Sequence, residues 1–276
     1  AARVDITAGR DAAVPALAGL VDSSIAATTG DVVVLSFADV GGSGAPALTA
    51  TAGDLIDLTI LGGLTKGLLT AGNDIRLVVT GALHDSDVIA TVGSVDAVVG
   101  QSISLTPFVA GSDINLVAMG DVTADSALDA DGDISLVVDG SLQVDVTAGG
   151  NANVVVSGDI MPTIMLHADR DATVAALGDI NANRIEAGRD VRAFSHGSMS
   201  ATLDADRDVR VAYARGDLWS TIHSGRHIRL VEVHGDVNTA WLDAATDIKQ
   251  VKVRGNIVAS TLEAGDDVLR VDVDGS

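Results

Sequence analysis

A repeat of about 20 residues runs through the whole chain and decides which folds it can form. Turn-like segments such as TAGRD, AGNDI, EAGRD and EAGDD recur, and their central residues run from Gly9 to Gly265 in thirteen steps of 17 to 23 residues. Repeats of this length are typical of solenoids, because a single unit cannot bury its own apolar face and must stack on its neighbours. About 14 units account for essentially all 276 residues.

A second turn marker lies between these segments in the C-terminal half. It recurs every 19 or 20 residues, at Gly158-Asp159, Gly178-Asp179, Gly197-Ser198, Gly216-Asp217, Gly235-Asp236, Gly255-Asn256 and Gly275-Ser276. Arg215-Gly216-Asp217 spells a tripeptide by which some cell-surface receptors recognise their ligands. Because Gly216-Asp217 falls on the marker, we interpret the tripeptide as a coincidence of the repeat.

The residues between the turns alternate with a period of two. In IRLVEVHG, Val231 and Val233 flank Glu232, and in IKQVKVRG, Val251 and Val253 flank a lysine. Alternating β-branched residues between Gly-Asp corners indicate strands. One hairpin per unit is an alternative, but the repeated pattern and short corners favour two or three strands that coil onward. We expect an all-β, right-handed parallel β-helix, one continuous domain over residues 1–276, about 65–70 Å long at ~4.8 Å per turn.

The composition fits a narrow aliphatic core and restricts the partners. Aromatic residues are 2% of the chain, cysteine is absent, and the net charge is −21. Such a charge repels nucleic acid and anionic membranes, attracts divalent cations and predicts neither nucleic-acid binding nor membrane insertion. We expect no cofactor apart from weak surface binding of Ca²⁺.

Segments such as NIVASTLEAGDDVLRVDVDG resemble the 19–20-residue repeats of filamentous-haemagglutinin-type bacterial adhesins. They also resemble Gly-Asp-Ile/Val repeat proteins of planctomycete-like bacteria. The resemblance covers nearly the whole chain. It implies secretion, a right-handed parallel β-helix, a place at the bacterial cell surface and a role in adhesion or surface architecture. Repeats of this kind occur in long arrays, so we also expect the chain to be part of a longer one.

Stacking of equivalent positions predicts columns of charge on the surface. One column is Arg170, Arg189, Arg207 and Arg226, and the adjacent one is Asp171, Asp190, Asp208 and His227. We expect both to be solvated and to fix the register between turns, because opposite charges offset the repulsion within each column.

Two sets of residues are candidate contacts. The scarce aromatic residues Phe194, Tyr213, Trp219 and Trp241 fall within three turns, and alternation places at least Phe194, Tyr213 and Trp241 outward. We expect a protein or glycan contact there, the alternative being that neighbouring loops cover them. In ALDADGDISL, Asp129, Asp131 and Asp133 alternate around Gly132, which resembles a calcium loop but coincides with a standard corner.

The pattern favours a non-catalytic extracellular rod, a cell-surface stalk or filament component. Steps of 17 to 23 residues leave no room for the long insertions that wall the clefts of β-helix enzymes. Its expected partners are other copies of itself or neighbouring repeats, and a surface glycan or protein. A fibre subunit that stacks end to end is the main alternative, and a β-helix enzyme acting on polysaccharides is a weaker one.

Overall fold

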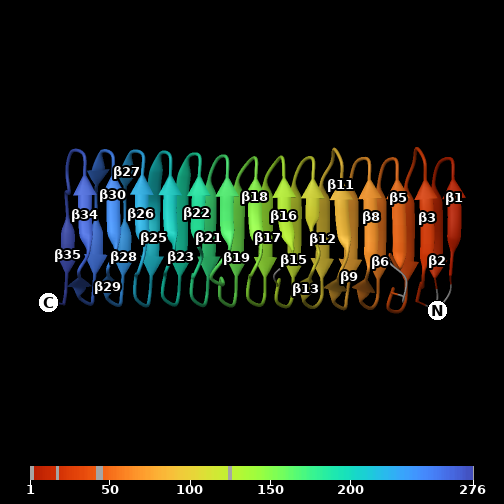
Figure 1. The fold of residues 1–276 in the computed structure, drawn as a ribbon, viewed down its shortest axis with the longest axis horizontal. Helices are drawn as coiled ribbons and strands as arrows, with labels where there is room; N and C mark the ends of the chain where they lie inside the picture. Colours follow the sequence, from red (N-terminus) through yellow and green to blue (C-terminus); the bar gives the residue numbers. More distant parts are fainter. Residues whose placement is uncertain (1–2, 17–18, 42–45, 124–125, 276) are drawn as a thin grey trace. The chain divides into compact units, whose positions relative to one another are not determined.

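The computed structural model describes residues 3–16, 19–41, 46–123 and 126–275, and the regular elements within these ranges are all β-strands. The prediction of an all-β parallel solenoid is confirmed, with about 14 turns (Figure 1). The chain divides into two compact units, residues 1–140 and 141–276, and each contains seven turns.

In the first unit each turn contributes one strand to each of two parallel sheets. The first sheet consists of β1 (Asp5–Ala8), β3 (Ser23–Ala27), β5 (Leu48–Ala52), β8 (Gly67–Ala71), β11 (Asp87–Ala90), β14 (Phe108–Ala110) and β16 (Ala127–Ala130). The second consists of β2 (Ala12–Ala16), β4 (Val32–Ser36), β6 (Ile56–Ile60), β9 (Ile75–Val79), β12 (Val95–Val99), β15 (Ile114–Ala118) and β17 (Ile134–Val138). A short third sheet consists of β7 (Leu64–Thr65), β10 (Leu83–His84) and β13 (Ile103–Ser104).

The second unit repeats this plan. Its first sheet consists of β18 (Asp145–Ala148), β20 (Met165–Ala168), β22 (Arg184–Ala187), β24 (Thr202–Ala205), β26 (Thr221–Ser224), β30 (Trp241–Ala244) and β34 (Thr261–Ala264). Its second consists of β19 (Ala152–Val156), β21 (Ala172–Ala176), β23 (Asp190–Ser195), β25 (Asp208–Ala214), β28 (Val231–Val233), β32 (Val251–Val253) and β35 (Val271–Val273). Shorter strands are β27 (His227–Ile228), β29 (Val237–Asn238), β31 (Asp247–Ile248) and β33 (Ile257–Val258).

Identical or similar side chains stack on one another inside each unit. Val32, Ile56, Ile75 and Val95 are register partners in successive turns, and all four are buried. Alanines form a second buried stack at the end of the first sheet, where the chain turns toward the second sheet, as in Ala168, Ala187 and Ala205. Phe108 is the one buried aromatic side chain among the described residues, as the low aromatic content predicts.

Outward positions of the second sheet are not all polar. Val78 and Val98 are register partners, and Val137 occupies the same column two turns further on. Their side chains are 40–43% exposed. Stacked β-branched residues favour the extended conformation and pack across neighbouring strands, so this column stabilises the sheet from outside.

The Gly-Asp corners are held by the side chain of one turn and the backbone of the next. Asp159 Oδ1 accepts a hydrogen bond from the Asp179 N–H at 2.8 Å, and Asp179 Oδ1 accepts one from the Ser198 N–H at 2.7 Å. A Cβ on Gly178 would lie 2.0 Å from Asp159 Oδ1, so glycine is required there by close approach. The repeated Gly-Asp pair is therefore an inter-turn contact as well as a turn signal.

Candidate functional site

The four candidate aromatic residues fall into two separate pairs. Phe194 and Tyr213 are register partners on β23 and β25, and both are half-buried on the outward side of the second sheet. The Tyr213 ring contacts the His234 ring edge-on, with a centroid distance of 5.4 Å and an interplanar angle of 73°. Tyr213 is thus partly covered by the next turn of its own chain.

Trp219 and Trp241 belong to the other side of the second unit. Trp219 lies just before β26, and Trp241 is the first residue of β30. Their side chains are 43% and 48% exposed. Thr221 follows Trp219 by two residues, and Trp241 is the register partner of Thr221 in the next turn. The structure brings these two tryptophans into one neighbourhood, away from Phe194 and Tyr213.

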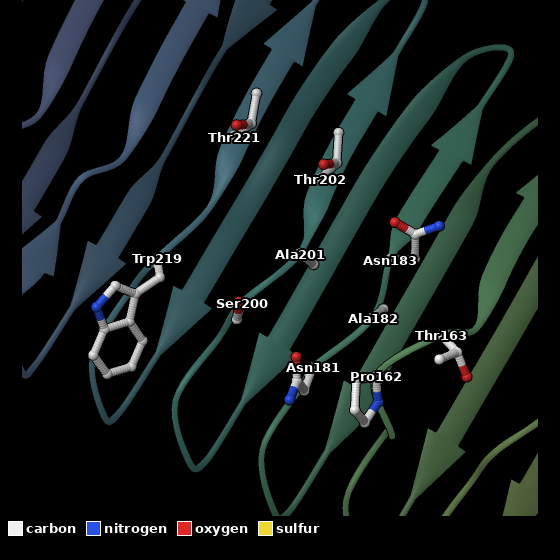
Figure 2. A pocket seen from close by; sticks show the side chains of 10 residues that line it. All are labelled: Pro162, Thr163, Asn181, Ala182, Asn183, Ser200, Ala201, Thr202, Trp219 and Thr221. Atoms are coloured by element: carbon white, nitrogen blue, oxygen red, sulfur yellow. The ribbon is translucent and has the colours of Figure 1, made fainter.

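A groove of about 510 Å³ lies beside Trp219. Figure 2 shows Trp219 at one margin, Pro162 and Thr163 at the opposite margin, and Ala182 and Ala201 between them. The remaining lining residues are Asn181, Asn183, Ser200, Thr202 and Thr221. Ala182 and Ala201 are nearly buried, and their small side chains leave the space that forms the floor.

Sequence reasoning selected Trp219 but missed this groove. Its lining lies where the chain enters β22, β24 and β26, outside the alternating stretches that mark the strands. The signal in the sequence is the recurrence of small and polar residues, NAN at 181–183 and SAT at 200–202, followed by WST at 219–221.

Asp129, Asp131 and Asp133 follow the alternation expected of a corner. Asp129 is on β16, and all three are exposed. The Asp133 N–H donates to Asp113 Oδ1 of the preceding turn at 2.7 Å, which is the same contact that other corners make. Within the described ranges no group of three or more His, Asp or Glu side chains is arranged to hold a metal ion.

The prediction of a solvated acidic column is wrong for Asp190 and Asp208, whose side chains are 1% and 0% exposed. Arg207 binds Asp190 through two hydrogen bonds of 3.1 and 3.0 Å, and Arg226 binds Asp208 through two of 3.1 Å. The guanidinium groups lie over the carboxylates and exclude water from them. The arginines themselves remain 40% and 47% exposed, in keeping with their predicted column.

A second arginine reaches each of these buried carboxylates. Arg210 hydrogen-bonds Asp190, and Arg229 hydrogen-bonds Asp208. Burial raises the pKa of Asp208, but the hydrogen bonds and charges of Arg226 and Arg229 together outweigh burial and leave the pKa at about 2. These ionised groups satisfy one another between turns, so the cluster is a structural clamp.

Asp217 of the Arg-Gly-Asp tripeptide also takes part in a corner contact. Its Oδ1 accepts a hydrogen bond from the Asp236 N–H at 2.8 Å, while Arg215 is exposed. Gly216 packs against the backbone of Gly197, as the other corner glycines pack on the preceding turn. The tripeptide is therefore built into the repeat rather than presented on a projecting loop.

No known family model, curated protein or solved structure matches the chain. The described residues include no helix that is long and apolar enough to cross a membrane.

Proposed function

We propose that this chain is a non-catalytic, extracellular β-solenoid that works as a structural and adhesive element, as part of a cell-surface stalk or filament. The observation that carries the proposal is the use of charged side chains between turns. Asp159, Asp179 and Asp217 accept backbone hydrogen bonds at the corners, and Asp190 and Asp208 are clamped by arginines.

These contacts suit a load-bearing part. Within each unit, successive turns are joined by backbone hydrogen bonds and by side chains, so tension or shear is shared over many contacts. The adhesin-type resemblance of the repeats points to the same role. Exposed acidic corners keep such a surface well hydrated and give it weak affinity for divalent cations.

End-to-end assembly is the second candidate, because another copy could continue the parallel ladders of the solenoid. In such a fibre Val271 and Val273 of β35, the register partners of Val251 and Val253, would lie between two stacked turns.

Negative-stain electron microscopy at several protein concentrations, with calcium and with chelator, tests both candidates. Single elongated particles of uniform length support a stalk component. Fibres that lengthen with concentration, and disappear in the Val271→Asp/Val273→Asp variant, support end-to-end assembly. Compact round particles contradict both.

The extracellular placement has its own test. Antibodies against the chain, applied to intact cells of the source organism, should label the surface in immunogold microscopy. Labelling that appears only after the cells are permeabilised contradicts the placement.

A further inference from the structure

The groove beside Trp219 crosses successive turns and suits an elongated ligand. Asn181, Ser200 and Trp219 occupy equivalent positions in three consecutive turns, and Thr202 and Thr221 are register partners in two of them. Neighbouring strands are spaced ~4.8 Å apart. That spacing is close to the length of one pyranose unit in an extended glycan, so polar groups recur at the interval of a sugar chain.

All ten lining residues are uncharged, and the polar ones are free to bind a ligand. Within the described part of the chain, the side chains of Asn181, Asn183, Ser200, Thr202 and Thr221 make no hydrogen bond to protein groups. Amides and hydroxyls both donate and accept hydrogen bonds. They match sugar hydroxyls, which also do both.

The charged side chains that border the groove are paired with one another. Arg184, the register partner of Thr202, forms ion pairs with Asp204 and with Glu186, and its hydrogen bond to Asp204 raises its pKa. His223 is 2.9 Å from Asp243. With an uncharged lining and these bordering groups engaged, the described part of the groove has no spare cation for a uronate or sulfate group.

Trp219 supplies an apolar surface at one margin of this polar lining. An exposed indole has a flat face that packs on the C–H face of a sugar ring, while its N–H donates a hydrogen bond. Trp241 is the register partner of Thr221 in the next turn, and its indole offers a second aromatic face on which a longer saccharide could pack.

The backbone of the groove is closed to an added strand and is strained at one margin. The N–H groups of Ser200 and Trp219 donate to the carbonyls of Ile180 and Met199 at 2.7 and 2.8 Å, so no strand can be added there. Thr163 has φ 118°, whereas the other described non-glycine residues with positive φ lie at 47–58°. Strained backbone of this kind clusters at ligand sites.

We propose that this groove binds a neutral saccharide chain, with Trp219 stacked on one sugar ring and the amides and hydroxyls of the following columns bonded to its hydroxyl groups. The inference rests on the proposed adhesive function and names its partner class. The ligand is recognised as a polymer of uncharged sugars and no reaction is performed on it.

The two tryptophans of the chain make the binding directly measurable. In Trp241→Phe the only indole is Trp219, so its fluorescence reports on the groove alone. Titration with a panel of neutral hexasaccharides (gluco-, manno-, xylo- and galacto-configured) should shift and saturate this emission for at least one member. Hexagalacturonate of the same length should leave it unchanged.

Two further variants locate the site. Trp219→Ala removes the stacking face, and Ser200→Arg fills the groove from an outward position without touching the core. Each should weaken binding of the same hexasaccharide at least tenfold by calorimetry, which is ~1.4 kcal/mol. Phe194→Ala, on the other sheet, is the matched control and should bind as the parent does. Circular dichroism should show that all variants are folded.

Three outcomes overturn the proposal: no response to any neutral saccharide, a response to the uronate alone, or undiminished binding in both Trp219→Ala and Ser200→Arg. The stalk proposal fails separately, through compact particles in electron microscopy. Elongated particles without saccharide binding would remove only the present inference.

Discussion

At many of the corners, one carboxylate oxygen of a turn accepts a hydrogen bond from the backbone of the next turn. Asp236 Oδ1 accepts from the Asn256 N–H at 2.7 Å, and in the first unit Asp74 Oδ1, at the Gly-Asn-Asp corner of residues 72–74, accepts from the Ser94 N–H at 2.9 Å. A carboxylate accepts such bonds more strongly than a neutral group does. Many of the residues responsible for the acidity of the chain therefore hold the turns in register.

The stability lost on replacing a corner glycine should depend on how closely the preceding turn approaches it. In Gly178→Ala the new Cβ would meet Asp159 Oδ1 at 2.0 Å and the Gly158 backbone at 2.8 Å. We expect the free energy of unfolding, measured by urea denaturation, to fall by about 2–3 kcal/mol. A Cβ added at Gly41 would meet nothing closer than Thr65 Cβ at 3.6 Å, so Gly41→Ala should change this free energy by less than ~0.5 kcal/mol. Equal losses at both sites would contradict this.

Asp208 should make stability depend on pH in the acid range. Its pKa is about 2 in the folded protein against 3.8 normally, so the unfolded chain binds the proton more tightly. Its contribution is complete above pH ~4 and is lost as the pH falls through ~2. We expect ~1–2 kcal/mol from this group, after allowance for solvent screening by the part-exposed arginines.

Comparison of Asp208→Asn with the parent protein checks this. The variant should be less stable at pH 7, and the difference should shrink toward pH 2. Asp171→Asn is the matched control, because Asp171 is more exposed and is bound by one arginine, Arg189, besides the Asp190 N–H. A pH-independent difference for Asp208→Asn would show that the clamp does not act through charge.

Among the elements, β25 departs from regular alternation. The register shifts between Val191/Arg192 of β23 and β25, so that Arg192 pairs with Val211 and Arg210 is extra. A β-bulge of this kind re-aims a side chain. Here the extra residue points Arg210 at Asp190, and Arg229 follows the short strand β27 in the same way onto Asp208.

Arg210→Ala should therefore destabilise the protein more than Arg192→Ala. It leaves the buried Asp190 with a single arginine, and we expect a loss of about 1–2 kcal/mol in urea denaturation. Arg192 is half-buried on β23 and has no described ion pair, so its removal should cost less than ~0.5 kcal/mol. The reverse order would mean that the bulge serves another contact.

The sequence predicts those elements whose pattern is local. The Gly-Asp corners follow from spacing alone. So does an outward column three residues before the corner glycines, and the register confirms it: Phe194, Tyr213, Glu232, Lys252 and Asp272. The β-bulge could not be predicted, because its only trace in the sequence is one extra residue in DVRVAY compared with DVRAF. The burial of Asp208 could not be predicted, because it depends on arginines from two positions. The groove could not be predicted, because it depends on the small side chains of Ala182 and Ala201.

Across the molecule, stability is built from contacts between adjacent turns. Such a solenoid behaves as a one-dimensional array, in which a destabilising substitution affects its own turn and the adjacent turns most. Leu203→Ala, at a fully buried position on β24, should lower stability by ~2–5 kcal/mol. Hydrogen exchange should accelerate in β22, β24 and β26 and remain nearly unchanged in β34, three turns away.

The exchange rates of the parent protein and of Leu203→Ala are compared by hydrogen-exchange mass spectrometry, under conditions in which the same fraction of each protein is folded. Thr202→Ala, an outward substitution on the same strand, serves as the control and should leave the exchange pattern as it is. Uniform acceleration throughout the second unit would show that its turns unfold as one block.

The repetition of the corner contact has a consequence for how such proteins change over generations. Each corner aspartate needs only a backbone N–H in the turn that follows, whichever turn that is. An in-frame duplication or loss of residues 159–178, one complete turn, would again place an aspartate opposite an N–H and one small aliphatic side chain on another. A gene that encodes such repeats can therefore gain or lose about 20 codons while the protein keeps a continuous core. The number of turns then becomes a heritable property on which selection can act.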